Sequence, residues 1–131
     1  MLKDMSQGLL VMIDDEEDLL DLLEYNFSRI GFDVKAFEEA NSAWQFISQS
    51  KPDLILCDWM MPGMTGLEFC KKVKEDMKLA DIPFVMFTCR GEQEAIADAH
   101  SVGVSDYIVK PVKISELVSR VQSLMSIRKQ A

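Results

Sequence analysis

Short apolar runs alternate with amphipathic segments five times along this chain, and that alternation constrains the fold more than any other feature. The runs predict five short strands, several of them nearly continuous in apolar character, as strands covered on both faces should be: residues 9–13, 33–37, 53–57, 84–87 and 107–109. Strands that alternate with helices predict right-handed βαβ crossovers and a parallel sheet with helices on both faces. The predicted class is α/β, doubly wound.

Helical periodicity fills the segments between the runs. Gly31 ends the first helix in a position that tolerates a left-handed backbone, and the second helix, at about 42–49, stops before Pro52. The fourth helix covers about 92–102 and ends at Gly103, and the fifth begins at about Ser115. Each helix is long enough to cross from one strand to the next.

The third helix has the clearest start. Thr65 and Glu68 have the spacing of a capping box, in which each side chain accepts a hydrogen bond from the other residue's backbone amide. After this capping box, helical spacing predicts that Leu67, Cys70 or Val73, and Met77 are buried.

Composition fits one soluble domain. The chain has 131 residues, 48% hydrophobic and 27% charged, so we expect a single domain over 1–131 with an ordered core at about 8–126 and poorly ordered ends. A chain of this size can bury a core without disulfides. The three cysteines, Cys57, Cys70 and Cys89, lack CxxC spacing and are expected to be reduced thiols.

Charge and hydropathy exclude two classes of partner. A formal net charge of −8 with scattered basic residues disfavours nucleic-acid binding by this domain. No apolar stretch approaches the ~20 residues of a membrane span, and the first residues lack the apolar region of a signal peptide. We therefore expect a cytoplasmic protein that does not bind membranes.

Carboxylates follow two of the predicted strands at the point where each ends. Asp58 comes directly after the third run, and Asp14 and Asp15 follow the first. In open α/β sheets the ligand crevice lies outside the carboxyl ends of the strands, so the three acids are expected to share one pocket. Like charges this close disfavour ionisation, and a hard divalent cation removes that cost. The sequence thus indicates a magnesium site.

A hydroxyl and an ammonium follow two further strands. Thr88 comes after the fourth run and Lys110 after the fifth, before Pro111, which cannot continue the strand. The hydroxyl can donate to a phosphoryl oxygen, and the lysine can pair with a carboxylate at rest and with a phosphoryl group afterwards. The set favours transfer of a phosphoryl group to a carboxylate.

Together these residues closely resemble the receiver domain of two-component response regulators, over roughly residues 9–125. The resemblance rests on five separated features in one order: Asp14-Asp15, Asp58-x-x-Met61-Pro62-x-Met64-x-Gly66, Thr88, Tyr107 and Lys110-Pro111. It implies a CheY-like, five-stranded parallel sheet in the order 2-1-3-4-5 with five helices.

The resemblance also implies a function, that of a phosphorylation switch rather than an enzyme with an external substrate. Asp58 would accept a phosphoryl group from a sensor histidine kinase or a histidine phosphotransfer domain, and the domain would support its own phosphotransfer and dephosphorylation. Mg²⁺ would be held by Asp14, Asp15, Asp58 and the backbone carbonyl of Met60. Thr88 and Lys110 would complete the site.

The resemblance further implies how the signal is passed on. Tyr107 would change rotamer with the hydroxyl of Thr88, and the face around the fourth helix, fifth strand and fifth helix would bind a downstream protein or a second copy. Residues that flank the acceptor, Met60, Cys89 and Arg90, would influence access and phosphoryl lifetime. Whether the chain acts alone or within a longer protein is left open.

Several alternatives stay open at this point. A haloacid dehalogenase-like hydrolase needs a second acid two residues after the nucleophile, where this chain has Met60, and it usually has a cap domain. A receiver-like interaction module without phosphorylation is the other rival. Tyr107 could be a fixed strand aromatic, and the acids at 16–18 could simply favour a helix N-terminus.

Overall fold

The computed structural model describes residues 6–130, and the predicted disorder of the first residues and of the last falls partly outside this range. Five strands form one sheet: β1 Gly8–Ile13, β2 Phe32–Phe37, β3 Leu54–Cys57, β4 Phe84–Thr88 and β5 Asp106–Val109. The helices between and after them are α1 Glu17–Arg29, α2 Ala40–Ile47, α3 Gly66–Glu75, α4 Gln93–Val102 and α5 Ile114–Gln130.

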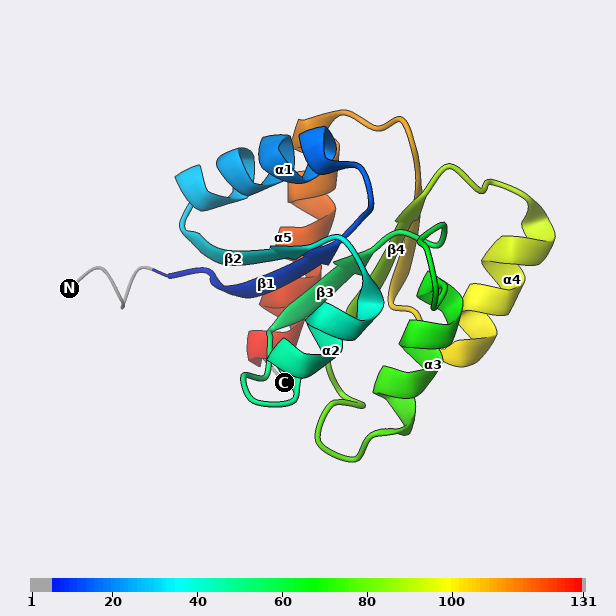
Figure 1. Cartoon of the computed structure of the whole chain (residues 1–131). Helices are drawn as coiled ribbons and strands as arrows, with labels where there is room; N and C mark the ends of the chain where they lie inside the picture. The colour runs from blue at the N-terminus through cyan, green and yellow to red at the C-terminus, as the bar shows by residue number, and fades with distance from the viewer. Residues whose placement is uncertain (1–5, 131) are drawn as a thin grey trace.

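All paired strands are parallel, and their order is β2-β1-β3-β4-β5. This confirms the predicted fold class and strand order. The observed strands differ from the predicted ones by one residue at an end, as at β4, which extends to Thr88. Figure 1 shows the sheet between two layers of helices, with α2 and α3 in front and α5 behind.

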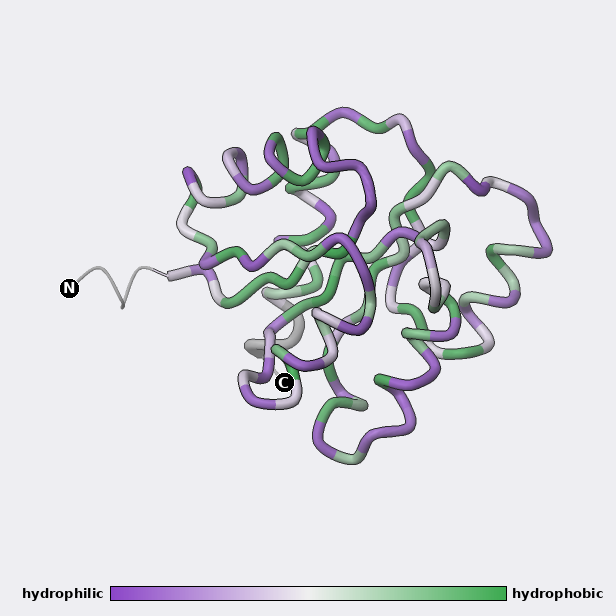
Figure 2. Tube along the Cα trace, viewed as in Figure 1, coloured by the Kyte–Doolittle hydropathy of each residue, from purple (hydrophilic) through white to green (hydrophobic). Residues whose placement is uncertain are grey.

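Two apolar clusters hold these layers together, one on each face of the sheet. Successive strand residues point to opposite faces, so Val11 and Ile13 pack with α2, α3 and α4, whereas Leu10 and Met12 pack with α1 and α5. Figure 2 shows the consequence, with hydrophobic strands inside and hydrophilic outer turns of the helices. Buried apolar side chains on both faces therefore hold the strands in place.

Helix ends follow the predicted chemistry. Gly31 and Gly103 have φ angles of 103° and 109°, a left-handed conformation that favours glycine after a helix. The capping box is confirmed: the Glu68 amide donates to Thr65 Oγ1 (3.2 Å), and the Thr65 amide donates to Glu68 Oε1 (2.9 Å). The start of α3 is thus fixed directly after the loop that follows β3.

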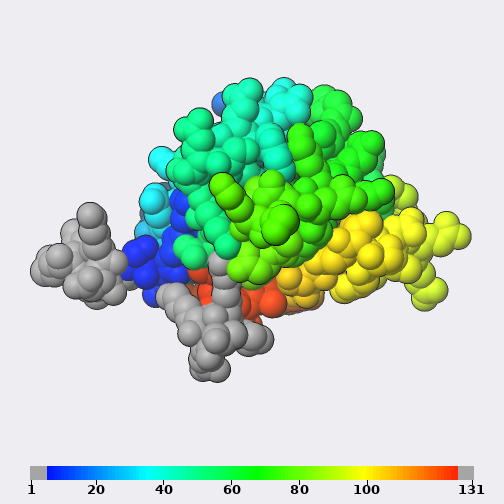
Figure 3. Space-filling model, turned by 90° about the horizontal axis from the view of Figure 1, so that it is seen from below, coloured from blue at the N-terminus to red at the C-terminus, as the bar shows by residue number. Residues whose placement is uncertain are grey.

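One prediction for α3 is wrong, because Met77 is 98% exposed. The helix ends at Glu75, and Asp76 Oδ1 accepts hydrogen bonds from the amides of Lys78 and Leu79, which starts a new turn. Leu79 is buried in place of Met77. In Figure 3, which views the molecule from below, the segment after α3 lies on the surface.

Within the described part of the chain, none of the helices combines the length and apolar character needed to cross a bilayer.

Candidate functional site

Four buried or largely buried residues meet at the carboxyl edge of the sheet, each from a different strand. Asp14 follows β1, Asp58 follows β3, Thr88 ends β4 and Lys110 follows β5. Their backbones prolong the hydrogen-bond ladder: the Asp58 amide donates to the Ile13 carbonyl (2.9 Å), and the Lys110 amide to the Thr88 carbonyl (2.8 Å). The sheet itself positions the site.

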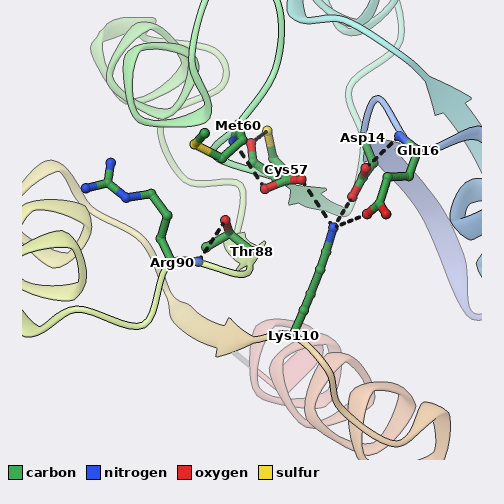
Figure 4. A network of polar contacts seen from close by, with 8 residues as sticks. Asp14, Glu16, Cys57, Met60, Thr88, Arg90 and Lys110 are labelled. Atoms are coloured by element: carbon green, nitrogen blue, oxygen red, sulfur yellow. Dashed lines mark hydrogen bonds and ion pairs between the residues drawn. The ribbon is translucent and has the colours of Figure 1, made fainter.

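Lys110 is the centre of the polar network. Its ammonium donates to Asp14 Oδ2 at 2.7 Å, to Glu16 Oε2 at 3.0 Å and to Asp58 Oδ2 at 3.2 Å. Figure 4 shows Asp14 and Glu16 side by side, facing the end of the Lys110 side chain. An ammonium has three N–H donors, so each is used by one carboxylate.

Burial and charge shift the pKa values in this network. Burial raises the pKa of Asp14, while hydrogen bonds from Lys110 and from the Glu16 amide oppose that rise. Burial lowers the pKa of Lys110, but hydrogen bonds to Asp14 and Glu16 and the negative charge of Asp14 and Asp58 outweigh it, so the net direction is upward. Lys110 is therefore charged at neutral pH.

The acids fit a hard divalent cation. One carboxylate oxygen each from Asp14, Glu16 and Asp58 lies within 4.8 Å of the other two, and Mg²⁺ prefers such oxygen ligands. Receiver domains bind Mg²⁺ at an acidic pocket of this kind. Asp15 is exposed and lines the neighbouring cleft rather than joining the group, and the Met60 amide donates to Asp58 Oδ1 (3.2 Å).

The predicted switch residues are linked through one loop residue, Arg90. Its amide donates to Thr88 Oγ1 (3.3 Å), and its carbonyl accepts a hydrogen bond of 2.6 Å from the Tyr107 hydroxyl. Tyr107 is buried, and burial raises its pKa. The two residues expected to act together thus contact the same stretch of backbone.

The Arg90 side chain packs against Trp59 beside the site. Its guanidinium lies 4.4 Å from the centre of the Trp59 ring and pairs with Glu92 at 2.9 Å. Trp59 and Arg90, with Met60, line a cleft of about 440 Å³ together with Asp15, Met61 and Thr65. Arg90 and Met60 both line this cleft, and their influence on access to Asp58 stays a prediction.

The cysteines near the acceptor differ in their surroundings. Cys57 is fully buried, and burial, followed by the charge of Asp58, raises the pKa of its thiol. Its Sγ donates to the Asp58 carbonyl at 3.2 Å. Cys89 is exposed beside Thr88, so its side chain does not fill the core behind the acceptor.

Sequence reasoning missed two residues of the site, Glu16 and Trp59. Glu16 was one of three acids at a helix start, and nothing in their order separates one from another. In the structure the Glu16 amide donates to Asp14 Oδ1 (2.9 Å), and Glu16 Oε2 accepts from Lys110; neither contact has a signal in the sequence. Trp59 follows the acceptor directly, but its contact with Arg90 has no signal in a sequence with two tryptophans and 14 basic residues.

Comparison with known proteins agrees with this geometry. The profile of the response regulator receiver domain matches residues 10–122. The phosphate regulon transcriptional regulatory protein PhoB of Rhizobium meliloti is 34% identical over 116 residues, which cover 88% of this chain and 51% of PhoB. The chain thus spans about half the length of the curated relatives it matches.

Two solved structures extend the comparison. The signal receiver domain of a signal transduction histidine kinase from Syntrophus aciditrophicus has a TM-score of 0.87 and 27% identity, covering 95% of this chain and 94% of that one. The BeF3-activated N-terminal receiver domain of Klebsiella pneumoniae RstA has a TM-score of 0.83 and 25% identity, covering 89% and 97%.

A parallel sheet with acids, a threonine and a lysine at its carboxyl edge defines the class of phosphoacceptor switches. The chain belongs to the receiver domain family of two-component response regulators.

Proposed function

We propose that this protein accepts a phosphoryl group on Asp58 from the phosphohistidine of a sensor kinase or of a histidine phosphotransfer domain. The observation that supports this most directly is the position of Lys110, whose ammonium bonds to Asp14 and Asp58 at once. A cation placed between two acids from different strands can hold the acceptor ionised and then stabilise the transferred group.

The proposed reaction is a displacement at phosphorus. An oxygen of Asp58 attacks the phosphorus atom, the P–N bond to the donor histidine breaks, and its electron pair stays on the imidazole nitrogen. Hydrolysis restores the unphosphorylated Asp58: water attacks the phosphorus, the P–O bond to Asp58 breaks, and inorganic phosphate leaves. Catalysis of such transfers is mainly positioning and charge stabilisation, which the fixed strand ends can supply.

Asp14, Asp15, Asp58 and the Met60 carbonyl are the proposed ligands of Mg²⁺. When bound, the ion neutralises charge on the acids and on phosphoryl oxygens. The carboxylates of Asp14 and Asp58 already lie together in the group of three acids, whereas Asp15 has to turn inward from the cleft.

The switch needs more than one contact. Moving a two-state equilibrium from 1:99 to 99:1 takes about 5.5 kcal/mol. One hydrogen bond to a charged group contributes about 1.5–3 kcal/mol, so Thr88 alone is insufficient and Lys110 and Mg²⁺ have to share the task. The proposed output surface is the face formed by α4, β5 and α5, which Tyr107 joins to Thr88 through Arg90.

The proposed partners are proteins: the donor kinase or phosphotransfer domain, and a downstream target or a second copy of this chain. We propose that this domain works in the cytoplasm and binds neither nucleic acid nor membranes. Its net charge of −8 supports the first of these exclusions, because phosphate backbones require clustered cations.

Phosphorylation with acetyl phosphate tests the assignment. With Mg²⁺ present, intact-mass spectrometry should find one added phosphoryl group per chain, and chelation of the metal should prevent it. Asp58→Asn should remain unlabelled. Equal labelling of Asp58→Asn, or no labelling of the unchanged protein by acetyl phosphate or any phosphohistidine donor, would refute the proposal and favour an interaction module.

A further inference from the structure

Glu16 belongs to the polar network but has no place in the function proposed above. It lies in the turn between β1 and α1, and its Oε2 accepts from Lys110 at 3.0 Å, closer than the 3.2 Å contact between Lys110 and the acceptor Asp58. A carboxylate that takes one of only three donors from the lysine influences what that lysine can bind next.

Burial differs sharply among the three partners of Lys110. The side chains of Asp14 and Asp58 are 5% and 8% exposed, whereas that of Glu16 is 61% exposed. A buried carboxylate that loses its cation pays the full cost of an unpaired charge, but an exposed one is rehydrated by water. Glu16 is therefore the partner that Lys110 can leave most easily.

Phosphorylation changes the charge that Glu16 faces. A phosphoryl group brings about −1.5 to −2 charge and three acceptor oxygens. The Glu16 oxygen lies within 4.8 Å of an oxygen of Asp58, so a dianion built on Asp58 would repel it. The same group offers Lys110 new acceptors, and all three of its donors are already in use.

We propose that Glu16 is a positioning residue that holds the Lys110 ammonium in the unphosphorylated state and releases it when a phosphoryl group is bound at Asp58. This inference rests on the function proposed above. Glu16 then competes with the phosphoryl group for the Lys110 ammonium: the more tightly Glu16 holds Lys110, the less the phosphorylated state is favoured. Its side chain touches neither the reacting atoms nor the face formed by α4, β5 and α5 in this arrangement.

Beryllofluoride with saturating Mg²⁺ serves as the phosphoryl mimic, and its affinity is measured from the fluorescence of Trp59 in a Trp44→Phe background. An exposed ion pair corresponds to roughly a 1.4- to 5-fold change in an equilibrium constant. We expect Glu16→Gln to bind beryllofluoride about 3-fold more tightly. Glu17→Gln removes the same charge from a neighbouring exposed residue that does not pair with Lys110, and its affinity should change less than about 1.5-fold.

Two further measurements separate holding of the lysine from general charge. In a Lys110→Ala background only the direct repulsion between Glu16 and the mimic remains, so the effect of Glu16→Gln should fall to less than about 1.5-fold. An effect as large there as in the unchanged protein would overturn the proposal in favour of simple repulsion. A crystal structure of the Mg²⁺–beryllofluoride form should place the Lys110 ammonium on a fluoride and beyond ~4 Å from the Glu16 carboxylate. An intact Lys110–Glu16 pair in that structure would also overturn it.

The remaining outcomes are equally decisive. If Glu16→Gln weakens Mg²⁺ binding and leaves beryllofluoride affinity at saturating Mg²⁺ unchanged, Glu16 is a metal ligand and the proposal is wrong. Failure of the unchanged protein to bind beryllofluoride at all, with no acetyl phosphate labelling of Asp58, would instead reject the phosphoacceptor function itself.

Discussion

Replacement of Gly66 should displace the backbone of the acceptor Asp58 without removing any of the reacting side chains. Gly66 is the first residue of α3, and its amide donates to the Trp59 carbonyl at 2.9 Å, which brings the helix start against the backbone that follows β3. A Cβ atom at this position would overlap the Asp58 carbonyl oxygen and lie 2.9 Å from both the Asp58 carbonyl carbon and Trp59 Cα. Backbone on both sides has to move.

The cost of Gly66→Ala can be worked out from this overlap. Overpacking a tight site typically costs about 1–3 kcal/mol, and the contact here is with backbone rather than with a side chain that can rotate. Alanine is the better helix former by at most ~1 kcal/mol, and less at the first turn. We therefore expect the free energy of unfolding to fall by about 1–2 kcal/mol.

Urea unfolding and acetyl phosphate labelling measure the two consequences. The urea midpoint should fall while the slope of the free energy against urea stays the same, and the labelling rate at Asp58 should fall because its carboxylate is displaced from Lys110. Gly91→Ala is the matched control, since its Cβ would approach only Val109 side-chain atoms, at 3.4 and 3.7 Å. A Gly66→Ala protein as stable and as readily labelled as the control would refute the reasoning.

Three further predictions concern single contacts. Lys110→Ala leaves the buried acids Asp14 and Asp58 unpaired, so in metal-free buffer the free energy of unfolding should fall by about 3–5 kcal/mol. Mg²⁺ should restore much of the lost stability. Hydrogen exchange of α4, β5 and α5 in this variant should no longer respond to acetyl phosphate. Tyr107→Phe removes the 2.6 Å hydrogen bond to the Arg90 carbonyl and should cost about 0.5–1.5 kcal/mol in the same unfolding assay. Hydrogen bonds from the amide and then the hydroxyl of Thr65 lower the pKa of Glu68. The stabilisation of the charged carboxylate is present above its unfolded pKa and is lost as pH falls through the lowered pKa, so Glu68→Gln should lower Tm at pH 7 and much less at pH 3.

The sheet and the polar residues at its carboxyl edge could be predicted from the sequence, because the strand and helix periodicities together determine where each strand ends. Apolar runs of three to five residues predict buried parallel strands, and a polar residue directly after such a run has to lie at the carboxyl edge. Asp14, Asp58, Thr88 and Lys110 all satisfy this condition. Their convergence needed no knowledge of loop geometry.

Loops and helix ends were less predictable, and the reason differs from case to case. The apolar spacing of α3 continues to Met77, but a local competitor, the Asp76 side chain, binds the next amides and ends the helix first. Lys74 then holds the new turn, donating to the Ala80 and Ile82 carbonyls at 3.2 and 2.7 Å. Such contacts between side chains and backbone do not change the apolar spacing of the sequence, so the spacing cannot predict them.

The site accordingly has two parts of different origin. Asp14, Asp58 and Lys110 follow strands directly, and their backbones are fixed by hydrogen bonds between neighbouring strands. Glu16, Met60 and the Arg90 side chain belong to loops and are partly or largely exposed, so substitutions there cost little stability. The proposed transfer to Asp58 depends on the first part together with Mg²⁺. In the second part, Glu16 pairs with Lys110, and Met60 and Arg90 line the cleft beside Trp59; we propose that these contacts influence how strongly Lys110 is held and how water reaches the acceptor. We therefore expect substitutions at these loop residues to change the lifetime of a phosphoryl group on Asp58 more than they change the capacity of Asp58 to be labelled.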